Sequence, residues 1–169
     1  MKIFLVGYVA SGKRKWARRI NEMYGIECID TRELMAELSG MKYSDLLKSK
    51  DDFIKYEQQA LDIVLQKENA VVVCGELLPC RADNMDRINQ NGLSIYLRAG
   101  LGCIMMKLPK KKHLIPMIQG IDSDLLPDFI KMELTNRKPF YSKAKHNLLE
   151  RELKKEQMKE IIDNYIKEL

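Results

Sequence analysis

The chain has 169 residues and a net charge of +5, with 46% hydrophobic and 31% charged residues. This length suits one domain with a substantial core and is short for two. No apolar run approaches the roughly 20 residues of a membrane span, and the run at 3–6 is too short for a signal peptide. We therefore expect a single domain over 1–169, located in the cytoplasm and without a membrane partner.

The predicted elements alternate between strands and helices. In chain order they are a strand at 2–6, a helix at 13–24, a strand at 26–29, helices at 32–38, 43–47 and 51–66, a strand at 70–74, a helix at 83–91, a strand at 93–97, a mobile loop flanked by short helices within 98–120, a helix at 124–136, a strand at 147–149 and a helix at 156–169. Thr31 is the expected N-cap of the helix at 32–38. This alternation predicts an α/β fold, with a parallel sheet covered by helices on both faces.

The cysteines and the basic residues indicate neither a metal site nor a nucleic-acid site. The four cysteines lack paired spacing, and neither histidine lies at ligand spacing from one of them. We expect buried free thiols, with Cys28 and Cys74 inside strand-like runs. Basic residues gather at 13–19 and 110–113 without interleaved aromatics, which favours solvated surface over nucleic-acid binding. A mildly basic balance also suits anionic ligands such as nucleotides.

The pattern G-x-x-x-x-G-K follows the first predicted strand and opens the first predicted helix. Its two glycines allow backbone angles that direct N–H groups inward at an anion, and the helix start adds a positive end. Lys13 is expected to reach the β- and γ-phosphates of a nucleotide. We therefore predict an ATP phosphate-binding loop made of Gly7, Ala10, Ser11, Gly12, Lys13 and Arg14.

The position after this lysine departs from the P-loop pattern. It is normally Ser or Thr, whose hydroxyl ligates Mg²⁺, and here it is Arg14, followed by Lys15. Both side chains are cationic donors and cannot ligate a metal. Mg²⁺ therefore needs another anchor, or these cations partly replace its charge. Phosphate binding survives such a change more easily than phosphoryl transfer does.

Further landmarks keep one order and spacing along nearly the whole chain. They lie at 3–8, 11–13, 28–31, Phe53 with Glu57, 68–72, 95–99 and 137–141. With them the chain resembles the shikimate kinase family of P-loop enzymes. The resemblance implies a three-layer αβα P-loop kinase fold with a five-stranded parallel sheet, a helical substrate-binding region at about 31–60 and a lid at about 107–123. It also implies transfer of the ATP γ-phosphate to a hydroxyl of shikimate, in aromatic amino-acid biosynthesis.

Several functional positions carry over from the family residue by residue. Lys13 matches the P-loop lysine, and Asp30 matches an acid that works near Mg²⁺. These two are the candidate catalytic residues, and Asp30 is the candidate metal ligand. Arg137 stands where the family binds the substrate carboxylate, and Gly75 matches the first glycine of the family's Gly-Gly-Gly after the third strand.

Other positions differ from the family's pattern. Arg32 replaces an acid that holds the substrate hydroxyls, Ile54 replaces a carboxylate-binding arginine, and Ile115 replaces the lid arginine. Glu76 replaces a glycine at the carboxyl end of the third strand, where open α/β sheets bind ligands. The candidate substrate-binding residues are Arg137, Gly75, Arg32 and Glu76.

Three functions stay open from the sequence, and with them the question of catalytic activity. The chain is a small-molecule kinase for shikimate or a related anionic hydroxylated compound, a family member that binds nucleotide or phosphate without turnover, or a kinase with a changed acceptor. In the last case Arg32 suits a more anionic substrate, and Glu76 is a base, a metal ligand or only a helix N-terminal charge. Lysines at 107–112 are lid cations or solvated surface. We expect a monomer.

Overall fold

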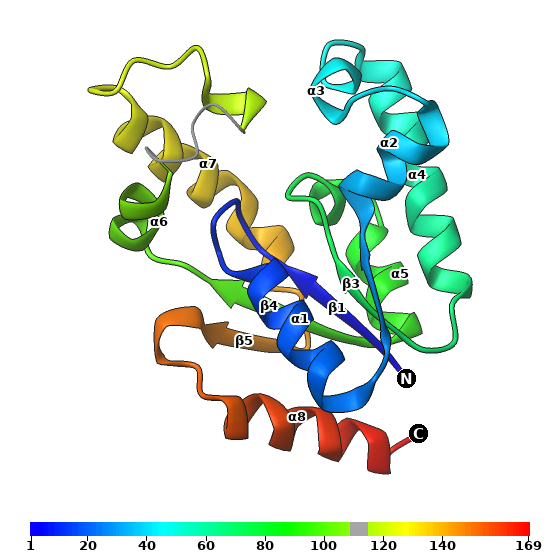
Figure 1. Cartoon of the computed structure of the whole chain (residues 1–169). Coiled ribbons are helices and arrows are strands. Elements are labelled where there is room, and N and C mark those ends of the chain that lie inside the picture. Colours follow the sequence, from blue (N-terminus) through cyan, green and yellow to red (C-terminus); the bar gives the residue numbers. More distant parts are fainter. Residues whose placement is uncertain (109–114) are drawn as a thin grey trace.

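The computed structural model describes residues 1–108 and 115–169 (Figure 1). The strands are β1 (Lys2–Val6), β2 (Glu27–Asp30), β3 (Ala70–Val73), β4 (Leu93–Arg98) and β5 (His146–Leu149). The helices are α1 (Lys13–Tyr24), α2 (Thr31–Ser39), α3 (Tyr43–Leu46), α4 (Lys50–Gln66), α5 (Asn84–Asn91), α6 (Leu101–Lys107), α7 (Leu126–Tyr141) and α8 (Lys155–Lys167). Short 3₁₀ turns are η1 (Leu78–Cys80), η3 (Pro116–Ile118) and η4 (Glu150–Glu152).

The five strands form one parallel sheet in the order β2-β3-β1-β4-β5, as predicted. Val73 at the end of β3 is in register with Leu5 of β1 on one side and with Asp30 of β2 on the other. The loops that leave these three strands therefore start at the same edge of the sheet. In open α/β sheets this carboxyl edge is where ligands bind.

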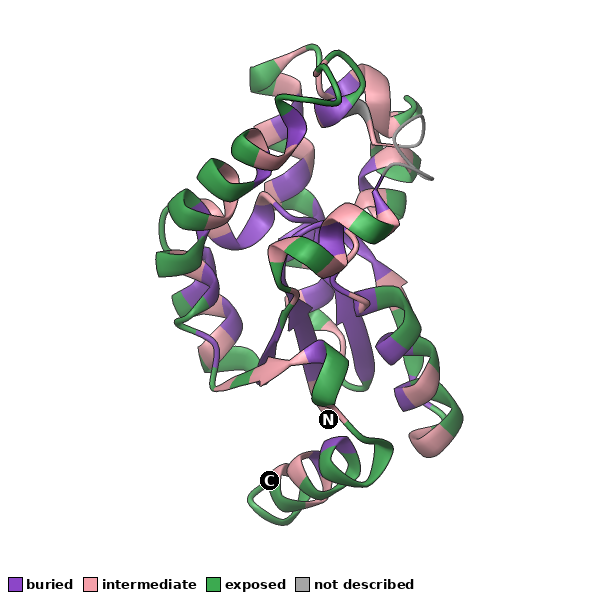
Figure 2. Cartoon of the chain, turned by 90° about the vertical axis from the view of Figure 1, so that its left-hand side faces the viewer, coloured by how far each residue is buried: buried purple, intermediate pink, exposed green. Residues whose placement is uncertain are grey.

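Helices cover both faces of the sheet, which confirms the three-layer αβα arrangement (Figure 2). Alternate residues of β1 point to opposite faces. Ile3 and Leu5 pack in a cluster with α1 and α8, whereas Phe4 and Val6 pack in a second cluster with α4, α5, α6 and α7. The central strands are thus apolar on both sides, as buried parallel strands are.

Helices α2, α3 and α4 share a small apolar cluster of their own, made of Met35, Leu46, Phe53 and Ala60. They span the region at 31–60 that we expected to bind substrate, and this role stays a prediction. Of the expected lid at 107–123, residues 109–114 lie outside the described part of the chain, with the lysine run at 110–112. Within residues 1–108 and 115–169, no helix has both the length and the apolar character needed to cross a membrane.

Three local expectations were wrong. Asp30, rather than Thr31, caps α2, because its carboxylate accepts a hydrogen bond from the Arg32 amide. Helix α7 continues to Tyr141, beyond the expected end at 136. Cys28 is exposed, because β2 is an edge strand, whereas Cys74 is buried and Cys80 and Cys103 are half-buried.

Candidate functional site

The loop between β1 and α1 can be closed this tightly only with glycine at two positions. Gly7 has a φ of +145°, and a Cβ there would lie 2.7 Å from the Leu97 carbonyl oxygen. Gly12 has a φ of +85°, and its Cβ would lie 2.8 Å from a carboxylate oxygen of Glu150. At Gly7 the nearby atom belongs to the backbone and cannot easily move, and at both positions the positive φ would strain any residue with a Cβ. The loop therefore has the backbone shape that the P-loop pattern predicts.

Two further loop residues carry features that the pattern did not indicate. Ala10 has a φ of +60°, a left-handed conformation that costs a residue with a Cβ about 1–2 kcal/mol. The Ser11 side chain is buried, and its hydroxyl has no hydrogen-bond partner within the described residues. Backbone strain and buried polar groups without hydrogen-bond partners are more frequent at functional sites than elsewhere.

Lys13 lies at the centre of this loop, at the first residue of α1. Its side chain is buried, and its ammonium donates hydrogen bonds to the carbonyl oxygens of Gly7 at 2.6 Å and Tyr8 at 2.8 Å. Burial lowers the pKa of Lys13 to about 8. A phosphate oxygen is a stronger acceptor than a neutral carbonyl, so this buried cation is suited to an anion bound in the loop.

Asp30 ends β2, and its carboxylate is already engaged by two arginines. Arg14 Nε lies 2.7 Å from one oxygen, and Arg32 donates its amide to the other at 2.9 Å. Burial raises the pKa of Asp30, but Arg32 and Arg14 outweigh burial and hold it below its usual range. Asp30 therefore stays an anion paired with guanidinium groups. Among residues 1–108 and 115–169, no cluster of three or more His, Cys, Asp and Glu side chains could hold a metal ion.

The loop after β3 carries the predicted residues Gly75 and Glu76. The Gly75 amide donates to the Thr31 hydroxyl at 2.8 Å, which ties this loop to the start of α2. Glu76 is buried with a carboxylate oxygen 3.6 Å from Arg32 Nη1, and this oxygen makes no hydrogen bond within the described residues. Glu76 and Arg32 thus lie together, and Arg32 neutralises Glu76 as well as Asp30.

Arg137 reaches the same area from α7. Its guanidinium pairs with Glu133 and lies over the Tyr8 ring, 5.1 Å from the ring centroid. Tyr141, one turn further along α7, donates its hydroxyl to the Glu76 carbonyl at 2.7 Å. Three buried polar atoms here have no hydrogen-bond partner among the described residues. They are the Tyr8 hydroxyl, Glu76 Oε2 and Arg137 Nη1.

Sequence reasoning missed Arg81, which follows η1. Its Nε lies 2.8 Å from the buried Glu57 carboxylate, and its guanidinium lies 5.8 Å from the centroid of the Phe53 ring. Burial raises the pKa of Glu57, and the hydrogen bond from Arg81 partly offsets this. Arg81 therefore places a cation beside Phe53 and Glu57, although the neighbouring Ile54 carries none. The signal that could have indicated Arg81 is Glu57 itself. A glutamate on a buried helix face needs a cationic partner, and the neighbouring Ile54 does not supply one.

Lys107, at the end of α6, links the base of the expected lid to the P-loop. Its ammonium donates to the Ala10 carbonyl at 3.3 Å and lies 3.7 Å from the Glu150 carboxylate. Lys15 pairs with the same carboxylate. Burial raises the pKa of Glu150, and the two lysines outweigh burial and lower it. One cation of the expected lid thus contacts the loop, and the lysines at 110–112 lie outside the described residues.

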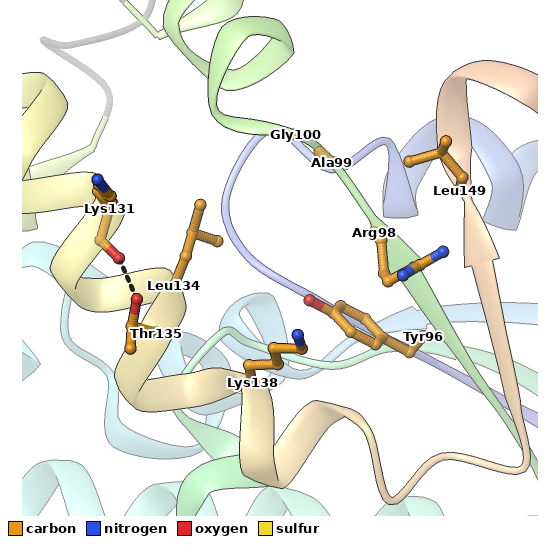
Figure 3. Close-up of a pocket in the computed structure, with 9 residues that line it drawn as sticks. All are labelled: Tyr96, Arg98, Ala99, Gly100, Lys131, Leu134, Thr135, Lys138 and Leu149. Carbon is orange, nitrogen blue, oxygen red and sulfur yellow. Dashed lines mark hydrogen bonds between the residues drawn. The ribbon is translucent and has the colours of Figure 1, made fainter.

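A separate open pocket of about 410 Å³ lies between the end of β4, the start of α6, α7 and the end of β5 (Figure 3). Arg98, Lys131 and Lys138 give its lining a positive charge, and Tyr96 lies between them. Tyr96 also packs against Tyr141, with ring centroids 5.2 Å apart. None of the predicted site residues lines this pocket.

Comparison with known proteins agrees with this geometry. The sequence profile of the shikimate kinase family matches residues 9–169. A shikimate kinase from Phocaeicola vulgatus is 30% identical over 171 residues, which cover 99% of this chain and 98% of the relative. One from Parabacteroides distasonis is 28% identical over 145 residues, covering 85% of this chain and 84% of the relative.

Solved structures show the same fold. The crystal structure of a shikimate kinase from Bacteroides thetaiotaomicron has a TM-score of 0.90 and 26% identity, and covers 96% of this chain and 98% of its own. The Acinetobacter baumannii shikimate kinase in complex with shikimate has a TM-score of 0.84 and 20% identity, over 96% of this chain and 93% of its own. The profile match spans most of the chain, and the chain therefore belongs to the shikimate kinase family.

Proposed function

We propose that this chain is a small-molecule kinase of the shikimate kinase type, which binds ATP at its P-loop and transfers the γ-phosphate to a hydroxyl of shikimate or a related anionic compound. One observation carries the proposal, namely the buried ammonium of Lys13 in a loop closed by Gly7 and Gly12. Such a loop at a helix N-terminus is a phosphate site. A cytoplasmic monomer is part of the same proposal.

The chain's own cations neutralise the charge that builds up during transfer. Phosphoryl transfer depends mainly on positioning and on charge neutralisation. Lys13 lies in the loop, and Arg14 extends from the next residue of α1 toward Asp30. In the family Mg²⁺ contributes to this neutralisation. Here the residues do not fit the ion, because Arg14 replaces the hydroxyl ligand and the Asp30 carboxylate is held by guanidinium groups.

On the acceptor side, two arginines are available. Arg137 lies over the Tyr8 ring, and Arg81 lies beside Glu57 and Phe53. An arginine fork pairs with a carboxylate through two parallel hydrogen bonds. The Tyr8 hydroxyl beside Arg137 and one oxygen of Glu76 make no hydrogen bond within the described residues, and both suit the hydroxyls of a polyol. A compound with a carboxylate and several hydroxyls, such as shikimate, fits this set.

A second function is favoured by one specific observation. Both oxygens of Asp30 are engaged by Arg14 and Arg32, so this carboxylate is poorly placed to orient an acceptor hydroxyl or a metal. A family member with such a site binds nucleotide or phosphate without transferring it.

A coupled ATP-turnover assay separates the two functions. The wild-type protein is compared with Lys13→Ala, in the presence and absence of shikimate. Shikimate-dependent turnover that disappears in the variant supports the kinase. ATP binding by the wild-type protein without turnover above the variant supports the binding function, and related anionic polyols are then tried as acceptors. Failure of the wild-type protein to bind either ATP or inorganic tripolyphosphate would reject both.

A further inference from the structure

Arg14 occupies the position from which a P-loop residue normally holds a metal ion. It directly follows Lys13 on α1, and its Nε lies 2.7 Å from the buried Asp30 carboxylate. A terminal nitrogen of the same guanidinium lies 3.0 Å from the Glu33 carboxylate on α2. The side chain is about half exposed, so the cation is anchored by α2 on one side and faces solvent on the other.

The remaining oxygen of Asp30 is also engaged. It accepts the Arg32 amide at 2.9 Å and lies 3.5 Å from Arg32 Nε, while Arg32 Nη1 lies 3.6 Å from Glu76. Mg²⁺ demands near-octahedral oxygen ligands at about 2.0–2.1 Å and keeps its water tightly. To bind here it would have to displace guanidinium groups from a buried carboxylate and then lie beside them. Two like charges at such distances repel one another.

We propose that Arg14 replaces the metal ion, so that this chain binds the phosphates of a nucleotide without Mg²⁺. The inference rests on the ATP site of the proposed function. A guanidinium carries five N–H donors, and Asp30 and Glu33 engage only two of its nitrogens. The rest can pair with phosphate oxygens in the forked geometry that arginine makes with phosphate. Lys13 and Arg14 then hold the polyphosphate from successive residues at the N-terminus of α1.

Calorimetric titration of the full chain with ATP tests this, once with EDTA and once with excess Mg²⁺. The wild-type protein is expected to bind ATP in EDTA at least as tightly as with Mg²⁺. Arg14→Ser removes the cation and restores a hydroxyl. This variant should bind ATP about tenfold or more weakly in EDTA, the loss expected for one charge-assisted contact, and should recover binding when Mg²⁺ is added.

Arg18→Ser is the matched control, because Arg18 is an exposed residue one turn further along α1. Its ATP affinity should equal that of the wild-type protein in both conditions. A wild-type protein that binds ATP only with Mg²⁺ would overturn the inference, as would an Arg14→Ser variant that binds ATP in EDTA like the wild-type protein. Thermal unfolding of both variants shows whether they are folded.

Inorganic tripolyphosphate separates failure of the inference from failure of the proposed function. If the wild-type protein binds tripolyphosphate in EDTA but not ATP, and Arg14→Ser binds neither, the metal-free phosphate site stands and the nucleotide function falls. If the wild-type protein binds neither probe in either condition, both are rejected.

Discussion

The loop after β1 and the loop after β3 start at the same edge of the sheet, yet they relate to the family in different ways. The β1 loop keeps both glycines and Lys13, and a Cβ at Gly7 or Gly12 would collide with neighbouring atoms. Around the β3 loop the family's charges have moved: Ile54 lacks a cation, and Arg81 supplies one to Glu57 from after η1. A site built from backbone amides requires one particular backbone conformation, which the glycines provide. A site built from side chains can be rebuilt from another position.

The largest expected effect tests whether Arg81 is needed by Glu57. Arg81→Leu leaves a buried carboxylate unpaired, which typically costs about 3–5 kcal/mol. We expect the free energy of unfolding in urea to fall by about this amount, and a second change, Glu57→Leu, to restore most of it. In the control Arg87→Leu, the lost partner Asp62 is exposed, so the cost should stay within about 1 kcal/mol. Equal losses in Arg81→Leu and the control would show that Glu57 does not depend on Arg81.

Arg137→Met tests whether the expected acceptor side is independent of the phosphate loop. Removal of one charge-assisted contact costs about 1.5–3 kcal/mol, so shikimate should bind roughly 10–100-fold more weakly. The affinity for ATP should remain that of the wild-type protein, because Arg137 contacts the phosphate loop only at the Tyr8 ring and pairs with Glu133, not with Lys13. Calorimetric titrations with each ligand measure this. Loss of ATP binding in a folded variant would mean that the acceptor side and the phosphate loop form one coupled site.

A smaller effect should follow from pH, through Lys13. Burial lowers the pKa of Lys13 to about 8, and phosphate binds the protonated form. As pH rises through about 8 the free protein loses this proton, so the dissociation constant for ATP should rise, approaching tenfold per pH unit. Titrations from pH 7.5 to 9.5 measure this. A constant affinity over that range would show that Lys13 keeps its proton or does not contact the phosphates.

The lowered pKa of Lys13 also makes the stability of the folded protein depend on pH. Because the pKa of Lys13 is depressed from 10.5, its contribution to stability is fully present above the unfolded value and is lost as pH falls through about 8. Lys13→Met should remove this component from the dependence of stability on pH.

The smallest expected effect concerns the backbone of the P-loop. Ala10→Gly removes the strain of an alanine in a left-handed conformation, which is about 1–2 kcal/mol. It also raises the conformational entropy of the unfolded chain, which lowers stability by about 0.4–1 kcal/mol. The net gain in unfolding free energy should lie between about 0 and 1.6 kcal/mol. Ala36→Gly, on a regular turn of α2, should instead cost about 1 kcal/mol. If Ala10→Gly destabilises the protein as Ala36→Gly does, Ala10 is not strained.

The sheet and the P-loop were predictable, because each depends on residues close together in the chain. Apolar runs marked the strands, and a glycine pattern after one of them marked the loop. The end of α7 was not predictable in the same way. Its last turn is held by Tyr141, which reaches Glu76 across the fold. The exposure of Cys28 depended on β2 being an edge strand, and a local pattern does not show strand order.

The sequence by itself determined the parallel αβα fold, the family and the glycine loop around Lys13, because glycine conformations and the strand–turn–helix order are local properties. Only the tertiary structure decided how the charges are shared. It joined Arg14 and Arg32 on Asp30, and it brought Arg81 to Glu57. Buried charges need partners at hydrogen-bond distance, and the side chain that fills this need is set by where the folded elements meet rather than by its place in the chain.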